Sequence, residues 1–133
     1  FDPKTLIKLR TKRFDLMHIH SPFASSVLVS NINHRPKVPV VLYHMGVPLM
    51  YERACQLARD IPNFYLSTCG AYVPVMRMGY QVAGPQKILF SSDAPFGDMC
   101  QEIDKVKSIA DNQADLELML GKNAAAMLGI DYH

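Results

Sequence analysis

The sequence has few cysteines and no long apolar run, and both features limit the classes of protein to consider. Three cysteines occur in 133 residues, and they form no C-x-x-C pair. Their wide spacing predicts reduced thiols in a cytoplasmic protein and argues against a disulfide framework or a cysteine-rich zinc site. No apolar run approaches the roughly 20 residues of a membrane-spanning helix. The first residues, FDPKTLIKLR, do not resemble a secretory signal.

The sequence also lacks a large excess of positive or negative charge. The net charge of +2 is too small to indicate a nucleic acid or an anionic membrane as partner. The sequence has neither G-x-G-x-x-G nor G-x-x-x-x-G-K-[ST], so nothing supports a nucleotide-binding open sheet. Hydrophobic residues make up 49% and charged residues 20% of the chain, as in ordinary globular domains.

A regular alternation of apolar strands and amphipathic helices runs through the chain. The predicted strands are short apolar runs at residues 14–20, 38–44, 63–69 and 87–93. The predicted helices have apolar stripes at residues 5–13, 49–60, 72–82, 98–110 and 115–128, with a loop and helix at 23–33. The last helix is expected to break near Gly121 and to end at Gly129. This order predicts a parallel sheet with helical crossovers, and it leaves open a barrel or a doubly wound sheet.

Each predicted strand has a polar residue at its C-terminal end. His20 ends the first strand, His44 the second, Thr68 or Cys69 the third, and Asp93 the fourth. In a βα barrel all parallel strands end at one rim, so these side chains are expected to meet. Two imidazoles and a carboxylate suit a zinc, manganese or iron ion. Such a metal lowers the pKa of bound water, and a carboxylate can take the proton as that water attacks.

More ordinary roles are available for some of these residues. Asp93 could instead cap the following helix, and a lone histidine at a strand end is often structural. Ligand-type residues at three independent strand ends favour the site. His18 is expected to be a buried structural histidine, and Arg77 an exposed helical arginine rather than a partner of a substrate carboxylate. His34 and His133 are given no role.

Strand alternation predicts which residues share a face. Leu89 and Ser91 precede Asp93 on one face, and Val40 and Leu42 precede His44 on another strand's face.

Four segments of the sequence resemble a known family: VVLYHMG, NFYLSTCG, KILFSSDAPFGD and LELMLGKNAAAMLGI. They resemble the amidohydrolase-related metal-dependent hydrolases. This branch of the amidohydrolase superfamily also contains aminocarboxymuconate-semialdehyde-type decarboxylases. In that family the sixth strand ends in His-x-Gly, and the eighth ends in [GS]-S-D-x-P, whose Asp binds the metal. A closing helix contains an Asn-Ala-x-x-Leu-like run, which corresponds here to residues 123–128.

The resemblance implies a role for each candidate residue. Asp93 would be a metal ligand and the general acid/base, and His20 would be the fifth-strand metal ligand. His44 would be the sixth-strand histidine, which binds the metal or polarises the substrate and transfers a proton. The implied cofactor is a divalent metal ion, with zinc first and manganese or iron as alternatives.

The sequence departs from the family pattern at its start. The family's first strand carries an H-x-H pair, and strands one to four have no counterpart here. His18-Ile19-His20 mimics that pair, but only 24 residues separate His20 from His44, which suits consecutive strands. A complete barrel needs about 250 residues, and the chain begins with Phe1 rather than Met. We therefore expect residues 1–133 to form one partial domain, strands 5–8 of a TIM (βα)8 barrel with the N-terminal half absent.

The leading functional hypothesis is a metal-dependent hydrolase in which metal-activated water attacks a small-molecule substrate. Decarboxylation of a small carboxylic acid is one alternative, and a catalytically inert truncated half-barrel is another. A third alternative is an open α/β sheet that binds a ligand without chemistry. Half a barrel would leave the edges FDLMHIH and KILFSSD unpaired, which invites association into a homo-oligomer.

Overall fold

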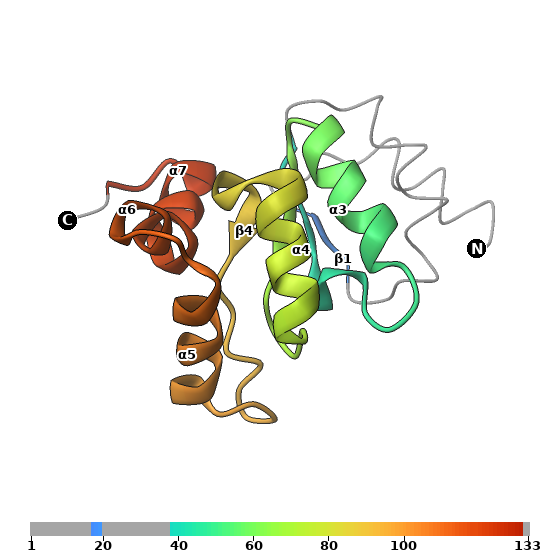
Figure 1. The fold of residues 1–133 in the computed structure, drawn as a ribbon. Coiled ribbons are helices and arrows are strands. Elements are labelled where there is room, and N and C mark those ends of the chain that lie inside the picture. Colours follow the sequence, from blue (N-terminus) through green and yellow to red (C-terminus); the bar gives the residue numbers. More distant parts are fainter. Residues whose placement is uncertain (1–16, 20–37, 132–133) are drawn as a thin grey trace.

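The computed structural model describes residues 17–19 and 38–131, in which strands and helices alternate (Figure 1). Four parallel strands form one sheet, with the order β1-β2-β3-β4. The strands are β1 (Met17–Ile19), β2 (Val40–Leu42), β3 (Phe64–Ser67) and β4 (Ile88–Leu89). The helices are α3 (Tyr51–Asp60), α4 (Val73–Ala83), α5 (Met99–Ile109), α6 (Gln113–Glu117) and α7 (Asn123–Leu128). The 3-10 turns η1 (Tyr43–Gly46) and η2 (Pro85–Lys87) and the π-helical turn η3 (Leu118–Lys122) complete the elements.

These elements confirm the predicted parallel sheet with helical crossovers. Each observed strand lies inside a predicted one, and α3, α4 and α5 match their predicted ranges to within two residues. The predicted helix at 115–128 is divided into α6, η3 and α7, with Gly121 inside η3. Gly129 follows α7 in the left-handed conformation, with φ of 66°. The helices predicted at 5–13 and 23–33 lie outside the described residues.

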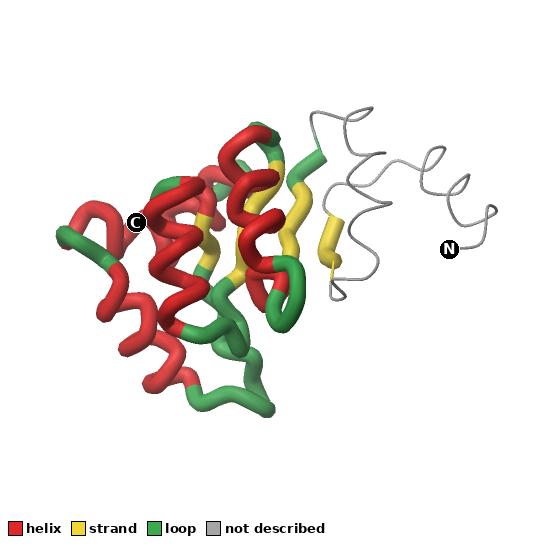
Figure 2. Tube along the Cα trace, turned by 45° about the vertical axis from the view of Figure 1, so that its right-hand side comes forward, coloured by secondary structure: helices red, strands yellow, loops and turns green. Residues whose placement is uncertain are grey.

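The four described strands follow one another in the sheet in the order of the sequence. A doubly wound sheet reverses its strand order at a switch point and carries helices on both faces. Here the order follows the sequence without reversal, and α3 and α4 lie side by side over one face of the sheet (Figures 1 and 2). The chain therefore has an α/β fold with a small parallel sheet.

The strand register separates the two faces of the sheet. The helix-packed core takes alternate strand residues, namely Val40, Leu42, Phe64, Leu66 and Ile88. The register places Leu42 beside Leu66, and Leu66 beside Ile88. The opposite face carries Val41, Ser67 and Leu89, which are also buried. Pocket residues at the strand ends continue this second face.

Helix α5 begins with a side-chain cap. The carboxylate of Asp98 accepts a hydrogen bond from the backbone N–H of Gln101 at 2.9 Å. Asp98 therefore caps the helix that follows β4. This excludes the capping role that was considered for Asp93.

The C-terminal helical segments fasten β4 at both ends. Asn123 Nδ2 donates hydrogen bonds to the carbonyl oxygens of Pro85 at 2.7 Å and Ile88 at 2.8 Å. Beyond the strand, the Phe90 N–H donates to the Met119 carbonyl at 2.9 Å. Met119 lies in η3, and such π-helical turns interrupt the regular hydrogen bonding of a helix. A strand of only two residues is thus held firmly just before the loop that carries Asp93.

Two further sequence predictions bear on the described residues. Cys55, Cys69 and Cys100, which were expected to be reduced thiols, are all free in the structure. None of the helices in residues 38–131 is long and apolar enough to cross a membrane.

Candidate metal centre

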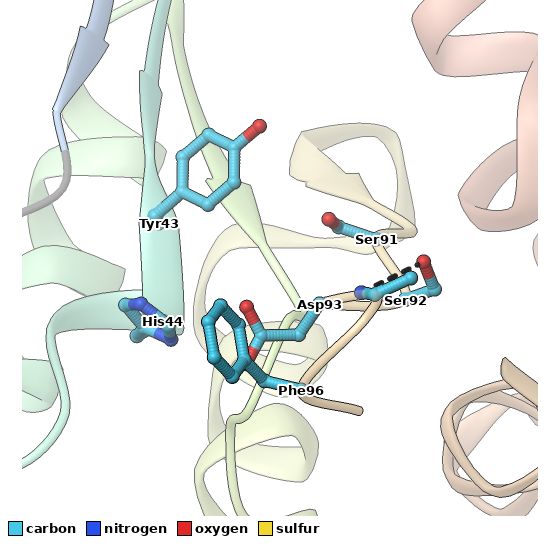
Figure 3. A pocket seen from close by; sticks show the side chains of 7 residues that line it. Tyr43, His44, Ser91, Ser92, Asp93 and Phe96 are labelled. Carbon is cyan, nitrogen blue, oxygen red and sulfur yellow. Dashed lines mark hydrogen bonds between the residues drawn. The ribbon is translucent and has the colours of Figure 1, made fainter. Parts of the chain in front are cut away.

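A pocket of about 540 Å³ opens where β2 and β4 end (Figure 3). Its walls come from η1 and from the loop that follows β4: Tyr43, His44, Ser91, Ser92, Asp93, Ala94 and Phe96. This is the C-terminal edge of the parallel sheet, where βα folds place their active sites. Two of the predicted site residues, His44 and Asp93, therefore share one pocket.

His44 reaches the pocket because the backbone leaves the strand conformation at this residue. His44 and Met45 have φ of 57° and 50°, a left-handed conformation that non-glycine residues rarely adopt. Strand alternation predicts His44 on the face of Val40 and Leu42, which is the helix-packed core. That prediction is wrong, because the left-handed turn ends the alternation and brings the imidazole to the pocket.

Cys69 holds the imidazole of His44 from behind. His44 Nδ1 lies 2.9 Å from the Cys69 carbonyl oxygen and 3.5 Å from Cys69 Sγ. A carbonyl oxygen only accepts hydrogen bonds, so Nδ1 carries the proton in this contact. In the neutral ring Nε2 then keeps its lone pair for a metal, a proton or a substrate. Carbonyl oxygens commonly orient metal-binding histidines in this way.

Asp93 also has a left-handed backbone conformation, with φ of 56°. Its carbonyl oxygen accepts hydrogen bonds from the N–H groups of Phe96 at 2.8 Å and Gly97 at 2.9 Å, which closes a tight turn. Figure 3 shows the carboxylate extending from this turn toward the side of the pocket where His44 lies. Such backbone conformations in non-glycine residues cluster at functional sites.

Gly70 gives His44 and Asp93 room to approach each other. It has φ of 60°, and a Cβ atom there would lie 3.1 Å from His44 Nδ1 and 3.4 Å from Asp93 Oδ2. Sequence reasoning used Gly70 only as the end of a predicted strand. The available signal was a glycine directly after a strand end, which indicates a close approach of other groups to the backbone.

Three donor types meet at this point. A nitrogen of His44, the sulfur of Cys69 and a carboxylate oxygen of Asp93 all lie within 4.8 Å of one another. Neighbouring ligands of a tetrahedral zinc are about 3.3–3.8 Å apart, given metal–ligand bonds of about 2.0–2.3 Å. The span of 4.8 Å is therefore somewhat wider than the ligand spacing of a closed tetrahedral site. Its donors fit a divalent first-row metal.

Burial sets the protonation of the two other acidic groups in the site. Burial raises the pKa of the Cys69 thiol, and the backbone of His44 and the hydroxyls of Ser67 and Ser91 lower it less. Burial is also the main cause that raises the pKa of Tyr43, followed by repulsion from Cys69 once that thiol is ionised and from Asp93. Both groups therefore stay neutral at physiological pH.

The other candidate residues fall in different places. His20 lies outside the described residues, so its role as a ligand stays a prediction. β1 ends at Ile19, which the register places beside Leu42, so β1 runs toward the pocket edge of the sheet. At the third strand end Thr68 Oγ1 accepts a hydrogen bond from the N–H of Ser91 at 3.1 Å. Thr68 thus ties β3 to the segment after β4, while Cys69 contacts His44.

Arg77 is used within the fold. Its guanidinium donates to the carbonyl oxygen of Ile109 at 3.1 Å and to that of Ser108, and it lies 3.5 Å from Asp111 Oδ1. These contacts fasten the C-terminal end of α5 to α4. The expectation that Arg77 does not serve the substrate agrees with this arrangement.

The sequence matches one family over most of its length. The family model described as Amidohydrolase matches residues 15–130. The chain belongs to the amidohydrolase family. This membership confirms the resemblance given by the four sequence segments and places the chain in a family of enzymes. No curated protein matches this amidohydrolase chain.

Solved structures share the fold of this amidohydrolase chain. An amidohydrolase from Burkholderia multivorans has a TM-score of 0.74 at 16% identity, covering 87% of this chain and 53% of that one. The 2,6-dihydroxybenzoate decarboxylase from Rhizobium has a TM-score of 0.62 at 19% identity, covering 81% of this chain and 42% of that one. A Polaromonas dihydroxybenzoic acid decarboxylase with bound manganese and the inhibitor 2-nitroresorcinol has a TM-score of 0.60 at 22% identity, covering 74% of this chain and 36% of that one. At these identities the likeness shows the fold alone, and the chain spans 36% to 53% of those proteins.

Proposed function

We propose that this chain is the C-terminal half of a (βα)8 barrel, strands five to eight, and carries part of a metal-dependent active site. The sequential order of four parallel strands under one helix layer supports this placement. The partial coverage of the related structures supports it as well. In this proposal residues 1–133 are a single partial domain of the complete enzyme.

The observation that carries the proposal is the meeting of His44 and Asp93 at one pocket. Asp93 is the proposed carboxylate ligand, and His20 is the proposed second ligand. His44 acts through Nε2, either on the metal or as the group that polarises the substrate and transfers a proton. A divalent metal bound here would polarise a substrate oxygen and lower the pKa of a bound water. Zinc is the ion favoured by the sequence, and the manganese of the Polaromonas neighbour supports manganese equally.

The reaction that we propose first is decarboxylation of a small aromatic carboxylic acid. The sequence favoured hydrolysis, but two of the neighbouring structures are decarboxylases of dihydroxybenzoic acids. In such a reaction the bond to the carboxylate breaks, CO2 leaves, and the carbon that keeps the electron pair takes up a proton. Asp93 and His44 are the pocket groups suited to supply that proton. The rings of Tyr43 and Phe96 offer aromatic walls for a planar substrate.

Hydrolysis is the second candidate, and the same pair of side chains favours it. A carboxylate and an imidazole at one pocket can act as general base toward water and general acid toward the leaving group. The Burkholderia neighbour is described as an amidohydrolase. The geometry of His44 and Asp93 serves either reaction, so the substrate must decide between them.

The test uses the intact protein, loaded with manganese or zinc. Incubation with 2,6-dihydroxybenzoate measures CO2 release, and a panel of small lactones and amides measures hydrolysis. We expect Asp93→Asn to lose the metal and to lower kcat by about 10²-fold or more, the scale of general acid–base catalysis. Asp98→Asn, at the α5 cap outside the pocket, should keep the metal and the wild-type kcat.

Two outcomes would replace this proposal. An intact protein that holds no divalent metal, with turnover unaffected in Asp93→Asn, would rule out the metal-dependent reaction. A protein that binds metal and ligand but turns over neither class of substrate would support the inert half-barrel or the binding sheet. The proposal also includes a small-molecule substrate, a cytoplasmic location and association into a homo-oligomer.

A further inference from the structure

The side chain of Cys69 has no part in the proposed reaction, yet it lies close to both His44 and Asp93. It is 0% exposed and lies behind the pocket wall. Its sulfur is 3.5 Å from His44 Nδ1, and it belongs to the donor cluster that also contains the Asp93 carboxylate. A thiol in this place has two physically distinct roles open to it, as a metal ligand or as a support for the imidazole.

The proton on His44 separates these roles. Nδ1 donates its proton to the Cys69 carbonyl oxygen at 2.9 Å, and a nitrogen that carries a proton cannot bind a metal. A metal on His44 would therefore lie beyond Nε2, at the opposite edge of the ring from the thiol. The sulfur is placed to support the ring rather than to complete the ligand set.

We propose that the Cys69 side chain is a positioning residue that fixes the ring orientation and the tautomer of His44. The inference rests on the proposed function only in taking His44 as the active imidazole. The carbonyl oxygen and the sulfur of one residue both contact Nδ1, so rotation of the ring about its Cβ–Cγ bond would break two contacts. The carbonyl alone would leave that rotation less restricted. Sulfur suits this position because it is large, polarisable and a weak acceptor.

The strand end holds Cys69 itself in place. Thr68, the preceding residue, bonds to the backbone of Ser91 through its hydroxyl, and the Thr68 carbonyl accepts a hydrogen bond from the N–H of Ala71 at 2.9 Å. A rigid turn thus presents both contact atoms of Cys69 to His44. Contacts from the neighbouring strand to Nδ1 thus hold one edge of the imidazole and leave Nε2 at the opposite edge of the ring.

The experiment compares Cys69→Ala and Cys69→Ser with Cys55→Ala in the intact protein. Cys55 is a matched control, because it is also 0% exposed but lies in α3. Nitrogen NMR of protein with labelled histidine reports the His44 tautomer without metal or substrate. We expect a single Nδ1-protonated form in wild type, Cys69→Ser and Cys55→Ala, and a mixture of tautomers in Cys69→Ala. Zinc affinity should fall about 10-fold or more in Cys69→Ala alone, as for other residues that orient metal-binding groups.

Several results would overturn the inference. The inference would be wrong if Cys69→Ala kept the wild-type nitrogen shifts of His44 and the wild-type zinc affinity. A thiolate-to-cobalt charge-transfer band after loading with Co²⁺, absent in Cys69→Ser, would show that Cys69 is a ligand instead. If Cys69→Ala does not fold, Cys69→Val tests the same loss of the sulfur with the volume retained. A protein that binds no zinc in any variant, but shows the tautomer change, would contradict the metal centre and support the positioning role.

Discussion

At the scale of single residues, backbone conformation brings the site together. Among the described residues, non-glycine residues with positive φ are His44, Met45 and Asp93, and two of these line the pocket. Gly70, between the two side chains in space, has a positive φ as well. Side chains from strand ends far apart in sequence therefore meet because four backbone positions adopt left-handed conformations.

Gly70→Ala should damage both stability and the site. It would place an L-residue at φ of 60° and a Cβ 3.1 Å from His44 Nδ1. Gly129→Ala is a matched control, because its φ is 66° and nothing lies within 4 Å of the added Cβ. Both variants should lose about 1–2 kcal/mol of unfolding free energy from backbone strain. Only Gly70→Ala should also lose metal affinity and about 10²-fold in activity, the scale of a misplaced catalytic group.

Urea unfolding and titration with zinc measure these two effects separately. Equal metal affinity in the two glycine variants would show that the space beside Gly70 does not matter for the site.

The buried thiol of Cys55 should lower the unfolding free energy at alkaline pH. Burial raises the pKa of its thiol from 9.0 to about 11. The folded protein therefore keeps the thiol proton longer than the unfolded chain does, and the unfolding free energy falls as pH rises from 9 to about 11. A shift of this size, reduced for partial solvent screening, corresponds to about 1–2 kcal/mol. Cys55→Ala should flatten this part of the curve of unfolding free energy against pH, which urea unfolding at a series of pH values measures.

Residue types and strand ends were enough to predict that His44 and Asp93 lie close together, since both sit where an apolar run stops. The face of His44 was predicted wrongly, because alternation assumes an extended backbone through that residue. The strand ends predicted that Thr68 or Cys69 would lie near His44, but not which of the two contacts it or through which atoms, since that depends on the register of two strands whose residues lie 25 positions apart. Gly70 carried a local signal, a glycine directly after a predicted strand end, but not the identity of the groups that approach it.

At the scale of elements, the shortest strand is the one that most needs support. β4 contains only Ile88–Leu89, and it leads to the Asp93 loop. Asn123 bridges the turn before this strand and the strand itself, and it is 7% exposed. We infer that the closing helix sets the position of the carboxylate through this clamp.

Asn123→Ala should therefore destabilise the fold by about 2–3 kcal/mol, because two carbonyl oxygens lose their donor in a buried place. The control is Asn112→Ala, an exposed helix cap that accepts from the N–H of Asp115 at 2.9 Å. Its loss should cost about 1 kcal/mol. Urea unfolding gives both values, and a smaller loss in Asn123→Ala than in Asn112→Ala would contradict the clamp.

Helices were easier to predict than strands and turns. The periodic apolar stripes of α3, α4 and α5 extend over three turns, so their ranges follow from sequence. The strands are shorter than predicted, because residues such as Tyr43 and Phe90 leave the sheet ladder for local turns or for the carbonyl of Met119. The break predicted near Gly121 falls in the π-helical turn at 118–122, but the π-helical form of that turn was not predicted.

At the scale of the whole molecule, one wall of the proposed barrel would hold only part of the proposed set of metal ligands. The described residues contribute Asp93 and His44 from β4 and β2. β1 is parallel to β2 and ends at Ile19, level with Leu42, at the edge of the sheet where the pocket opens. A ligand directly after β1 would complete the wall, and His20 is the residue at that place in the sequence.

The last prediction tests this completion in the intact protein. Zinc at about 100 times its Kd should raise the unfolding free energy by about 2.7 kcal/mol, which a thermal melt detects as a higher Tm. His20→Ala should lose most of this rise, because removal of a ligand weakens metal binding, whereas His34→Ala should keep it. The two variants change the same residue type, so a general effect of losing a histidine would lower both. A full zinc response in His20→Ala would mean that Asp93 and His44 take their further ligands from another part of the protein.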